Sequence, residues 1–539
     1  MTHDVFNQVP PLTGHDVSAD PALLAGTARE NAGWATEELR RLGTLAGSEQ
    51  AGEWGRLANE HPPVLRTHDR YGHRIDEVDF HPAWHELMTV AVENGLHAAP
   101  WSSARPGAHV ARAAKFYLWS QVEAGHGCPI SMTYAAVAAL RHSPALAADW
   151  EPLLTSRSYD FGLRPPLGKR GVLAGMAMTE KQGGSDVRAG TTRAEPLGDG
   201  GYALTGHKWF NSAPMCDVFL VLAQAPGGLS CFLLPRVLPD GTRNAVRLMR
   251  LKDKLGNRSN ASAEVEYHGA VAWLVGEEGR GVRTILEMVN MTRLDCVIGS
   301  AAGMRYGVTQ AVHHATHRGA FGRRLIDQPL MRNVLADLAL ESEAATTLMT
   351  RLAGATDRAV AGDRAESALR RTTLAVGKYW VCKRGPVHAA EALECLGGNG
   401  YVEESQMPRL FRESPLNGIW EGSGNVAALD VLRALGREPE TLEAFFSEVT
   451  LAAGADRHLD EAVDRLRKSL GDLTDIEARA RRVAEDMALV LQASLLVRLA
   501  PAAVADAFCA SRLAGEAGRA FGTLPPRLDL DALIERAVI

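Results

Sequence analysis

The sequence predicts an α+β protein of several domains: a helical N-terminal domain, a central antiparallel β-barrel or β-sandwich, a helical bundle and an extra helical C-terminal domain. A chain of 539 residues is too long for one hydrophobic core. Apolar residues recur at helical spacing in the first third of the chain and again after about residue 280. Short β-branched segments, separated by turn residues, lie between them. We therefore expect domains at 1–170, 171–279, 280–439 and 440–539.

The N-terminal domain is expected to consist of an arm followed by helices. The first thirty or so residues are polar and contain Pro and Gly, which is typical of an arm that packs on another part of the protein. Apolar residues then recur every three or four positions in three segments, Asn31–Leu45, Trp84–Leu96 and Ala108–Ala124. These spacings predict helices as far as about Phe161.

The central region has the composition of a β domain. Six segments read as strands: Gly171–Met178, Tyr202–Lys208, Val218–Ala223, Leu229–Pro235, Val246–Leu251 and Ala263–Tyr267. The connections Gly198-Asp199-Gly200-Gly201 and Pro226-Gly227-Gly228 are typical of hairpins. Because no helical pattern comes between the strands, an antiparallel barrel or sandwich is favoured over a parallel sheet.

Helical periodicity returns near Gly279. Four mostly long, Ala- and Leu-rich segments predict a bundle of about four helices: Val282–His317, Gln328–Ala353, Ala365–Cys395 and Val426–Leu435. Glu440–Ile539 reads as a further helical block with its own Pro and Gly breaks.

Composition excludes several classes of protein. An apolar fraction of 46% and a net charge of −6 fit a globular protein and argue against a globally basic nucleic-acid binder, although not against a local basic face. Seven scattered cysteines without a C-x-x-C pair predict reduced thiols and a cytoplasmic protein. His313 and His317 are four residues apart, but no third ligand lies nearby, so we expect no metal site. The N-terminus lacks a signal-peptide pattern, and no run of about 18 apolar residues predicts a membrane span.

The stretch Met178–Val187, M-T-E-K-Q-G-G-S-D-V, could bind a phosphate. Thr179 and Ser185 offer hydroxyls, and Gly183 and Gly184 let the backbone approach a ligand closely. The chain contains no G-x-G-x-x-G dinucleotide motif. A glycine-rich turn by itself more often serves only as a turn. Whether this one binds a phosphate depends on motifs elsewhere in the chain.

Four later segments could also carry chemistry, and each has a plainer interpretation. By itself, G-H-K-W-F-N-S at 206–212 would be a strand with buried aromatics, and R-G-A-F-G at 318–322 a solvated helix end. L-G-G-N-G-Y at 396–401 would also serve as a helix stop, and I-W-E-G-S-G-N at 419–425 as the acidic start of a helix.

Taken in this order, the five segments resemble the acyl-CoA dehydrogenase family, from the N-terminus to about Gly436. The family patterns are T-E-x-x-x-G-S-D, G-x-K-x-W-I-T, R-x-x-F-G, L-G-G-x-G-Y and Y-E-G-T, with Trp420 in place of the family's Tyr. The resemblance implies that the protein binds FAD. It implies the following cofactor-binding residues: Met178, Thr179, Gly184, Ser185, Phe210, Ser212, Pro214, Arg318, Phe321, Gly397, Gly398, Trp420, Gly422, Ser423 and Asn425.

By the same resemblance, Glu421 is the candidate catalytic base. In the family the matching Glu removes a proton from the α-carbon of the substrate while hydride passes to the flavin. Such a base needs to lie within reach of the carbon acid, in a dry pocket that raises its pKa. The resemblance also implies that Phe210 packs on the flavin and that Arg318 reaches the pyrophosphate of an FAD bound mainly by a neighbouring subunit.

Other segments resemble one branch of this family, which acts in the adaptive response to DNA alkylation. They are F-N-Q-V-P-P-L at the start, L-K-D-K-L-G-N-R-S-N-A-S at 251–262 and the long C-terminal extension. The branch implies a homotetramer that binds double-stranded DNA, limits alkylation damage and has weak acyl-CoA dehydrogenase activity. The candidate DNA-binding residues are Arg433, Arg465, Arg467, Lys468, Arg481, Arg482 and Arg512.

The charge of the C-terminal block leaves this assignment open. Residues 441–539 hold 12 Lys and Arg against 16 Asp and Glu, whereas DNA binding needs clustered cations. The cations could equally be solvated helix faces balanced by acids. A second basic run, Arg236–Arg258, could be a surface of the β domain or part of a positive groove.

Two functions from different classes follow. In one, the protein is an oxidoreductase that oxidises an acyl-CoA, an alkylating agent or an alkylated base at Glu421 and the flavin. In the other, it is a DNA-binding shield whose flavin is mainly structural. A plain acyl-CoA dehydrogenase of lipid or amino-acid catabolism, with Glu421 as its base, is the alternative to both.

Overall fold

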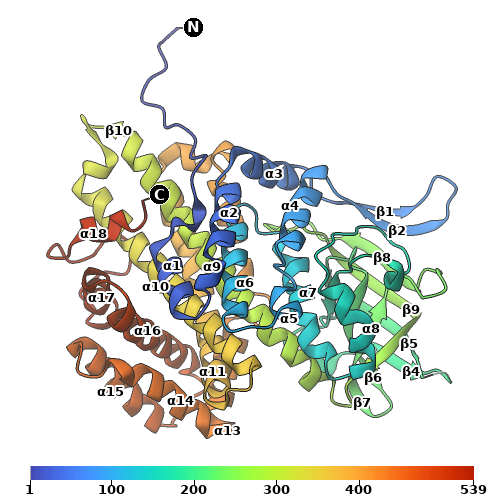
Figure 1. Cartoon of the computed structure of the whole chain (residues 1–539). Coiled ribbons are helices and arrows are strands. Elements are labelled where there is room, and N and C mark those ends of the chain that lie inside the picture. Colours follow the sequence, from blue (N-terminus) through green and yellow to red (C-terminus); the bar gives the residue numbers. More distant parts are fainter. Residues whose placement is uncertain (1, 199, 539) are drawn as a thin grey trace. The chain divides into compact units, whose positions relative to one another are not determined.

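The central strands form one seven-stranded sheet in the computed structural model, which describes residues 2–198 and 200–538. The strands are β3 (Ala174–Ala177), β4 (Arg193–Pro196), β5 (Tyr202–Ser212), β6 (Val218–Ala225), β7 (Gly228–Pro235), β8 (Val246–Leu251) and β9 (Ser262–Val275). Their order is β3-β6-β4-β5-β9-β7, with β8 added to β9. Because β7 also pairs with β6, the strands β6, β4, β5, β9 and β7 close into a barrel (Figure 1).

The expectation of a purely antiparallel sheet is wrong at two pairings. β3 runs parallel to β6, and β4 runs parallel to β6 at Arg193 and Gln224. The chain between β3 and β6 passes through two other strands, so it is long enough to return in the same direction. All other pairings of this sheet are antiparallel.

Short turns connect the hairpins of the sheet as the sequence predicts. Ala225 pairs with Gly228 across a two-residue turn, Pro226-Gly227, between β6 and β7. β4 and β5 are antiparallel and are joined through Gly198-Asp199-Gly200-Gly201, of which Asp199 lies outside the described residues.

The N-terminal third contains a hairpin that the sequence analysis missed. Its helices are α1 (Pro21–Arg29), α2 (Thr36–Ala46), α3 (Glu49–Glu60), α4 (Pro82–Glu93), α5 (Ala99–Ser102), α6 (Ala108–Ser120), α7 (Gly127–Leu140) and α8 (Pro144–Leu154). Between α3 and α4, β1 (Val64–His68) and β2 (Arg74–Asp79) pair antiparallel. Both strands are short, and the buried positions of β2 hold Asp76 as well as Val78, so they carry little of the apolar alternation by which a strand is recognised.

The C-terminal half is helical. It contains α9 (Gly281–His317), α10 (Pro329–Val360), α11 (Arg364–Glu394), α12 (Met407–Glu413), α13 (Gly424–Arg437), α14 (Pro439–Val449), α15 (Arg457–Gly471), α16 (Ala480–Leu499), α17 (Ala502–Phe508) and α18 (Leu530–Glu535). A small hairpin, β10 (Gly319–Ala320) and β11 (Arg323–Arg324), separates α9 from α10.

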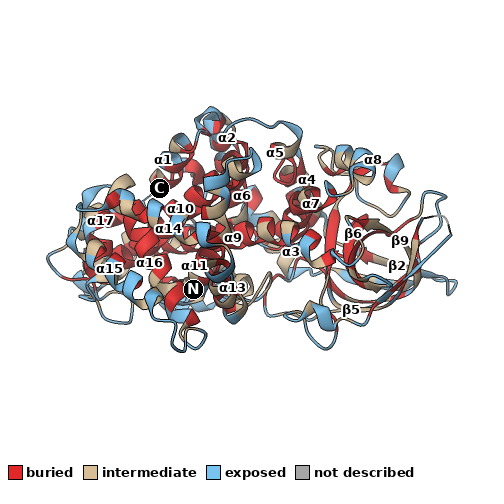
Figure 2. Ribbon diagram, turned by 90° about the horizontal axis from the view of Figure 1, so that it is seen from below, coloured by how far each residue is buried: buried red, intermediate tan, exposed pale blue. Residues whose placement is uncertain are grey.

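Helix α10 is the centre of this half. Every residue from Leu335 to Thr356 is buried, and α10, α11 and α16 pack on one another (Figures 1 and 2). A helix that is buried on all sides has to pair its charged residues. Asp337 pairs with Arg512, Glu341 with Arg384 and Glu343 with Arg536.

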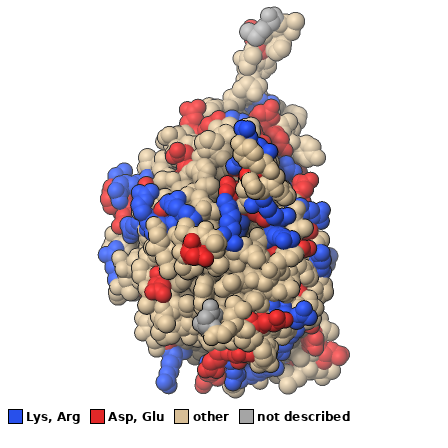
Figure 3. Space-filling view, turned by 90° about the vertical axis from the view of Figure 1, so that its right-hand side faces the viewer, with Lys and Arg blue, Asp and Glu red and all other residues tan. Residues whose placement is uncertain are grey.

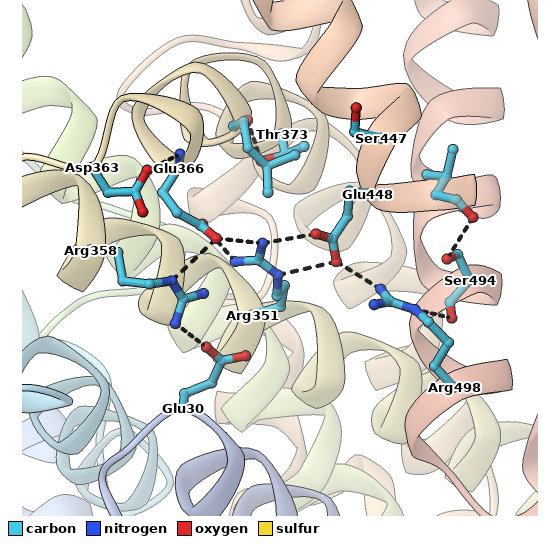
Figure 4. Close-up of polar contacts among 12 residues, drawn as sticks. Glu30, Arg351, Arg358, Asp363, Glu366, Thr373, Ser447, Glu448, Ser494 and Arg498 are labelled. Atoms are coloured by element: carbon cyan, nitrogen blue, oxygen red, sulfur yellow. Dashed lines mark hydrogen bonds and ion pairs between the residues drawn. The ribbon is translucent and has the colours of Figure 1, made fainter. Parts of the chain in front are cut away.

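An ion-pair network joins α10 and α11 to the last hundred residues (Figure 4). Arg351 on α10 lies 2.9 Å from Glu366 on α11 and 2.8 Å from Glu448 on α14. Glu448 in turn lies 2.7 Å from Arg498 on α16. The C-terminal block is therefore tied to the bundle by buried charges as well as by apolar packing.

The chain divides into two compact units, and their limits differ from the four predicted domains. One unit comprises Met1–Glu49, Pro106–Val122 and Arg293–Ile539, and the other comprises Gln50–Arg105 and Glu123–Thr292. The sheet belongs to the second unit, and the helices from α10 to α18 belong to the first. Within the described part of the chain, no helix has the length and apolarity that a membrane span requires.

Candidate functional site

The loop after β3 brings two of the predicted motifs together. The Trp209 N–H donates to the Thr179 carbonyl at 2.8 Å, and the Lys181 N–H donates to Nε2 of His207 at 3.0 Å. The stretch Met178–Val187 and the segment 206–212 therefore lie side by side.

A buried ion pair underneath this loop fixes its shape. Lys208 Nζ lies 2.9 Å from Glu180 Oε1 and donates to the Leu222 carbonyl at 2.8 Å. The Glu180 carboxylate also accepts from the backbone N–H groups of Thr191 and Thr192. Burial by itself would raise the pKa of Glu180, but Lys208 and these donors hold that pKa well below its ordinary value. Glu180 therefore stays ionised at neutral pH. Both residues lie inside motifs of the sequence, but no local pattern indicates that they pair.

Two glycines of the loop have distinct roles. A Cβ on Gly184 would lie 2.3 Å from Thr179 Oγ1. A side chain at this position would therefore collide with that hydroxyl. Gly183 has a φ of +132°, a conformation that favours glycine. Ser185 is exposed and Met178 is half-buried, so the loop presents polar groups at its surface.

A bulge in β5 turns an aromatic side chain outward. β5 has one more residue than β9 between Lys208 and Asn211, which is where Trp209 and Phe210 lie. Phe210 is 48% exposed, and Lys252 Nζ lies 4.8 Å from its ring centre and 3.2 Å from that of Trp209. The plainer expectation, that both aromatics are buried in a strand, does not hold for Phe210.

The end of β5 contributes a hydroxyl and a tight turn. Ser212 Oγ lies 3.5 Å from Ser262 Oγ on β9. Pro214 is buried, and its carbonyl accepts a hydrogen bond from the guanidinium of Arg236.

The Glu421 turn lies in the helical unit and is held by two cations. Glu421 has a φ of +58° and Gly422 a φ of +104°, and a left-handed backbone is strained for a glutamate. Arg293 Nε donates to the Glu421 carbonyl at 3.0 Å, and Lys378 Nζ donates to the Gly422 carbonyl. Arg293 is itself fixed by Asp430 at 2.6 Å. These contacts fix the conformation of the turn.

Trp420 precedes Glu421 in this turn, and Ser423 and Asn425 follow it. The Trp420 indole donates to Asn417 Oδ1 at 3.0 Å, so this ring is tied to the segment before it. Ser423 precedes α13 without a capping hydrogen bond from its side chain, and Asn425 is exposed on the first turn of that helix.

Two cations meet the start of α13. A Cβ on Gly424 would lie 2.9 Å from Lys383 Cε and 3.0 Å from Arg481 Nη2. Arg481 was predicted as a DNA contact, but the fold brings it beside a predicted cofactor motif. Because Arg481 comes from the C-terminal block, no local sequence pattern could have indicated this.

Two of the three glycines in the 396–401 segment have an exposed backbone. Gly397 and Gly398 are exposed, and a Cβ on either would meet no atom within 4 Å. By contrast, a Cβ on Gly400 would lie 2.1 Å from the Leu393 carbonyl, which is the reason for glycine there. Gly397 has a φ of +60°, as a glycine that ends a helix often has.

The R-G-A-F-G motif forms the hairpin between α9 and α10. Phe321 is at its tip with a φ of +54° and a side chain that is 97% exposed. The Arg318 guanidinium donates to the carbonyl of Asn7 in the N-terminal arm. The predicted arm therefore does pack on another part of the protein.

Six of the seven predicted DNA contacts lie on three helices, of which α13 and α15 both pack on α16. Arg433 is 53% exposed at its side chain and lies 3.2 Å from Asp430. Arg482 is 72% exposed and lies 3.0 Å from Asp486, and Arg465 is 59% exposed. Arg467 stacks 4.3 Å from the ring centre of Phe446, next to the exposed Lys468.

Arg512 is the exception among these cations. Its guanidinium pairs with Asp337 and Glu341 on α10, and its side chain is only 14% exposed. Because Arg512 pairs with two buried carboxylates, we leave it out of the proposed DNA surface, and its contact with DNA stays a prediction.

The side chains of each unit suit an FAD molecule. The sheet unit offers the hydroxyls of Thr179 and Ser212 and the exposed ring of Phe210. The helical unit offers Arg318 and open backbone at Gly397, both of which suit phosphate or ribose oxygens. The ring and hydroxyls of the sheet unit suit a flavin, and the cation of the helical unit suits a pyrophosphate.

Comparison with known proteins agrees with these motifs. Three family models match in sequence: the adaptive response protein AidB N-terminal domain at residues 7–161, the acyl-CoA dehydrogenase middle domain at 175–270 and the acyl-CoA dehydrogenase C-terminal domain at 279–436. A protein of Escherichia coli (strain K12) that carries the name AidB is 49% identical over 512 residues, which are 94% of each chain. The chain belongs to the acyl-CoA dehydrogenase family.

Solved structures of related proteins have the same fold. ACDH-11 of Caenorhabditis elegans, solved in complex with C11-CoA, has a TM-score of 0.88 at 28% identity and matches 95% of this chain and 94% of its own. An acyl-CoA dehydrogenase of Bacillus anthracis complexed with FAD has a TM-score of 0.65 at 19% identity, over 80% and 81% of the two chains. The predicted fold class is confirmed, and membership of the family supports FAD as the cofactor.

Proposed function

We propose that this protein is an FAD-containing member of the AidB branch that binds double-stranded DNA and limits its alkylation damage. The observation that carries the DNA part is the gathering of Arg433, Arg465, Arg467, Lys468, Arg481 and Arg482 on three helices that pack together. Binding to DNA would release counterions from the phosphates that these cations neutralise. Support also comes from the 49% identity to the E. coli AidB protein over nearly the whole chain.

The proposed DNA surface is local. On the side of the β strands, which Figure 3 shows, Lys and Arg lie among Asp and Glu. The whole chain has a net charge of −6. An acidic protein of this kind binds DNA only through a defined group of cations, so a few substitutions should remove most of the affinity.

Duplex binding at several salt concentrations tests this proposal. The double variant Arg481→Ala with Arg482→Ala should weaken binding at 50 mM salt and reduce the slope of log K against log salt by about 2, because each lost phosphate contact accounts for roughly 0.9. The pair Arg40→Ala with Arg41→Ala on α2, also exposed and adjacent, is the matched control. Equal salt slopes for the two variants would rule out this surface.

A second candidate function is the oxidation of an acyl-CoA. Its support is the Glu421 turn, which Arg293 and Lys378 hold at both carbonyls, and the C11-CoA complex of the structurally similar ACDH-11. Bound FAD supplies the acceptor for hydride. Glu421 would take the proton from the carbon next to the thioester carbonyl, and the fixed turn would keep its carboxylate aimed at that carbon.

Glu421→Gln distinguishes the two functions. Without its carboxylate, the variant should lose bleaching of the oxidised flavin by acyl-CoA by a factor of at least about 100, the usual lower range for a general base. Glu404→Gln, an exposed carboxylate of the same unit, should bleach normally. DNA affinity and protection from alkylation should persist in Glu421→Gln if the shield function holds, and a loss of protection would contradict it.

We also propose that the protein is a homo-oligomer, with a tetramer as the expected state. The exposed Phe321 at the tip of a hairpin is suited to a contact with a second copy of the chain. Light scattering of wild type and Phe321→Ala tests this proposal, and an unchanged mass would remove Phe321 from the interface.

A further inference from the structure

The N-terminal arm, residues 2–16, is bonded to the hairpin of Arg318 and Phe321 across more than 300 residues of sequence. The amide of Asn7 donates from Nδ2 to the Gly319 carbonyl at 2.8 Å and accepts at Oδ1 from the Gly319 N–H at 2.8 Å. The Asn7 carbonyl accepts from the Arg318 guanidinium. Asn7 thus bonds to both backbone groups of Gly319. Through its carbonyl it also orients the guanidinium of Arg318, the residue before Gly319.

The hairpin needs such support. It consists of two residue pairs only, Gly319 with Arg324 and Ala320 with Arg323. A hairpin this small is not stable by itself in water, and the left-handed backbone of Phe321 adds strain. On its other side, Gln328 Nε2 donates to the Ala320 carbonyl at 2.9 Å. Asn7 and Gln328 therefore hold the strand β10 from two directions.

The arm is itself anchored beyond Asn7. The carbonyl of Pro10 lies 2.8 Å from His313 Nε2 on α9, and the Gly14 N–H donates to the Gly47 carbonyl at 2.7 Å. A Cβ on Gly47 would lie 2.0 Å from the His15 carbonyl, so the arm approaches α2 as closely as glycine permits. Before Asn7, the chain extends away from the helices (Figure 1).

We propose that the N-terminal arm is a strap that positions Arg318 and Phe321 for the cofactor, with Asn7 as the positioning residue. This inference rests on the proposed role of those two residues in FAD binding. Asn7 bonds to the hairpin. It acts by fixing the peptide of Gly319 and by holding the guanidinium plane of Arg318 through one N–H, which leaves the remaining donors for a phosphate. Retention of FAD then depends on a residue outside every cofactor motif of the sequence.

The test uses the holoprotein and two readouts. In Asn7→Ala, the Gly319 amide should exchange with solvent at least tenfold faster, because its acceptor is gone. Bound FAD, followed by flavin fluorescence after dilution, should leave about tenfold faster. Gln8→Ala is the matched control, since this neighbouring side chain makes only a 3.5 Å contact with the Phe6 carbonyl. A chain without residues 2–12 should behave as Asn7→Ala does.

Three outcomes separate the possible failures. Unchanged exchange at Gly319 in Asn7→Ala would overturn the strap itself. Faster exchange with unchanged FAD release, in a protein whose Arg318→Ala variant does lose FAD faster, would overturn the positioning role. If Arg318→Ala retains FAD normally, the proposed cofactor role of the hairpin fails, and with it the inference that rests on it, while the exchange data still report the contact.

Discussion

His388 on α11 is a buried histidine that we expect to make the protein sensitive to acid. It is fully buried, its Nε2 lies 3.1 Å from the Leu338 carbonyl, and its ring meets Phe521 edge-on. Burial lowers the pKa of His388 to about 4, from an ordinary value of 6.5. The folded state therefore keeps this imidazole neutral under conditions in which the unfolded chain binds a proton.

The lowered pKa of His388 makes the free energy of unfolding depend on pH. Because the unfolded state binds more protons between pH 6.5 and 4, stability is full above pH 6.5 and falls as the pH decreases through this window. At pH 5 the expected loss from His388 is about 2 kcal/mol, since each pKa unit is worth roughly 1.4 kcal/mol. His388→Gln should be less stable at pH 7 but should lose about 2 kcal/mol less than wild type between pH 7 and pH 5 in urea titrations.

The exposed His68 provides the control for this prediction. His68→Gln should show the same loss of stability between pH 7 and pH 5 as wild type. If His388→Gln and wild type lose equal stability over this range, His388 does not control the acid response.

At the scale of elements, the structure places four helices around one network of charges. Arg351 on α10 binds Glu366 on α11 and Glu448 on α14, and Glu448 binds Arg498 on α16 (Figure 4). Burial would raise the pKa of Glu448, but Arg351 and Arg498 hold it below the ordinary value. This contribution to stability is present above the unfolded value of about 4.5 and is lost as the pH falls further.

Replacing Glu448 should therefore loosen the helices from one another. Glu448→Gln removes the charge that faces Arg351 and Arg498, and we expect a loss of about 3 kcal/mol in the free energy of unfolding at pH 7, as is usual for a broken buried ion pair. Urea unfolding followed by circular dichroism measures this loss. Glu440→Gln, exposed on the same helix, should change stability by less than about 0.5 kcal/mol. Equal stability of the two variants would show that the network contributes little.

The elements themselves could mostly be predicted because their signals are local. The long Ala- and Leu-rich segments became α9, α10, α11 and α13, and the β-branched segments became β5 to β9, within a few residues for most ends. The hairpin of β1 and β2 was missed because its short strands have little apolar alternation. The parallel pairing of β3 was missed because the direction of a strand is decided by the path of the chain between strands.

At the scale of the whole molecule, the last hundred residues are part of the helical core. Arg512 and Arg536 pair with Asp337, Glu341 and Glu343 on the buried helix α10. A chain that ends at residue 439 would leave these carboxylates with fewer partners and would expose the apolar face that α16 covers.

We therefore expect a 1–439 fragment to aggregate or to lack a cooperative unfolding transition, whereas the full chain unfolds cooperatively. Expression of both chains, followed by size-exclusion chromatography and thermal unfolding, measures this difference. A monodisperse 1–439 fragment that binds FAD would show that the C-terminal block is an independent addition.

The sequence by itself determined the family, the class of fold and the motifs of the cofactor, because these depend on short segments such as Met178–Val187 whose backbone and chemistry are local. Arg512 pairs with Asp337 and Glu341, whereas Arg482 stays exposed. The tertiary structure determines in this way which cations remain available to bind a partner. It also decided that Asn7 supports Gly319. The reason is physical: ion pairs and hydrogen bonds between distant segments depend on how the chain packs, which no local pattern of residues records.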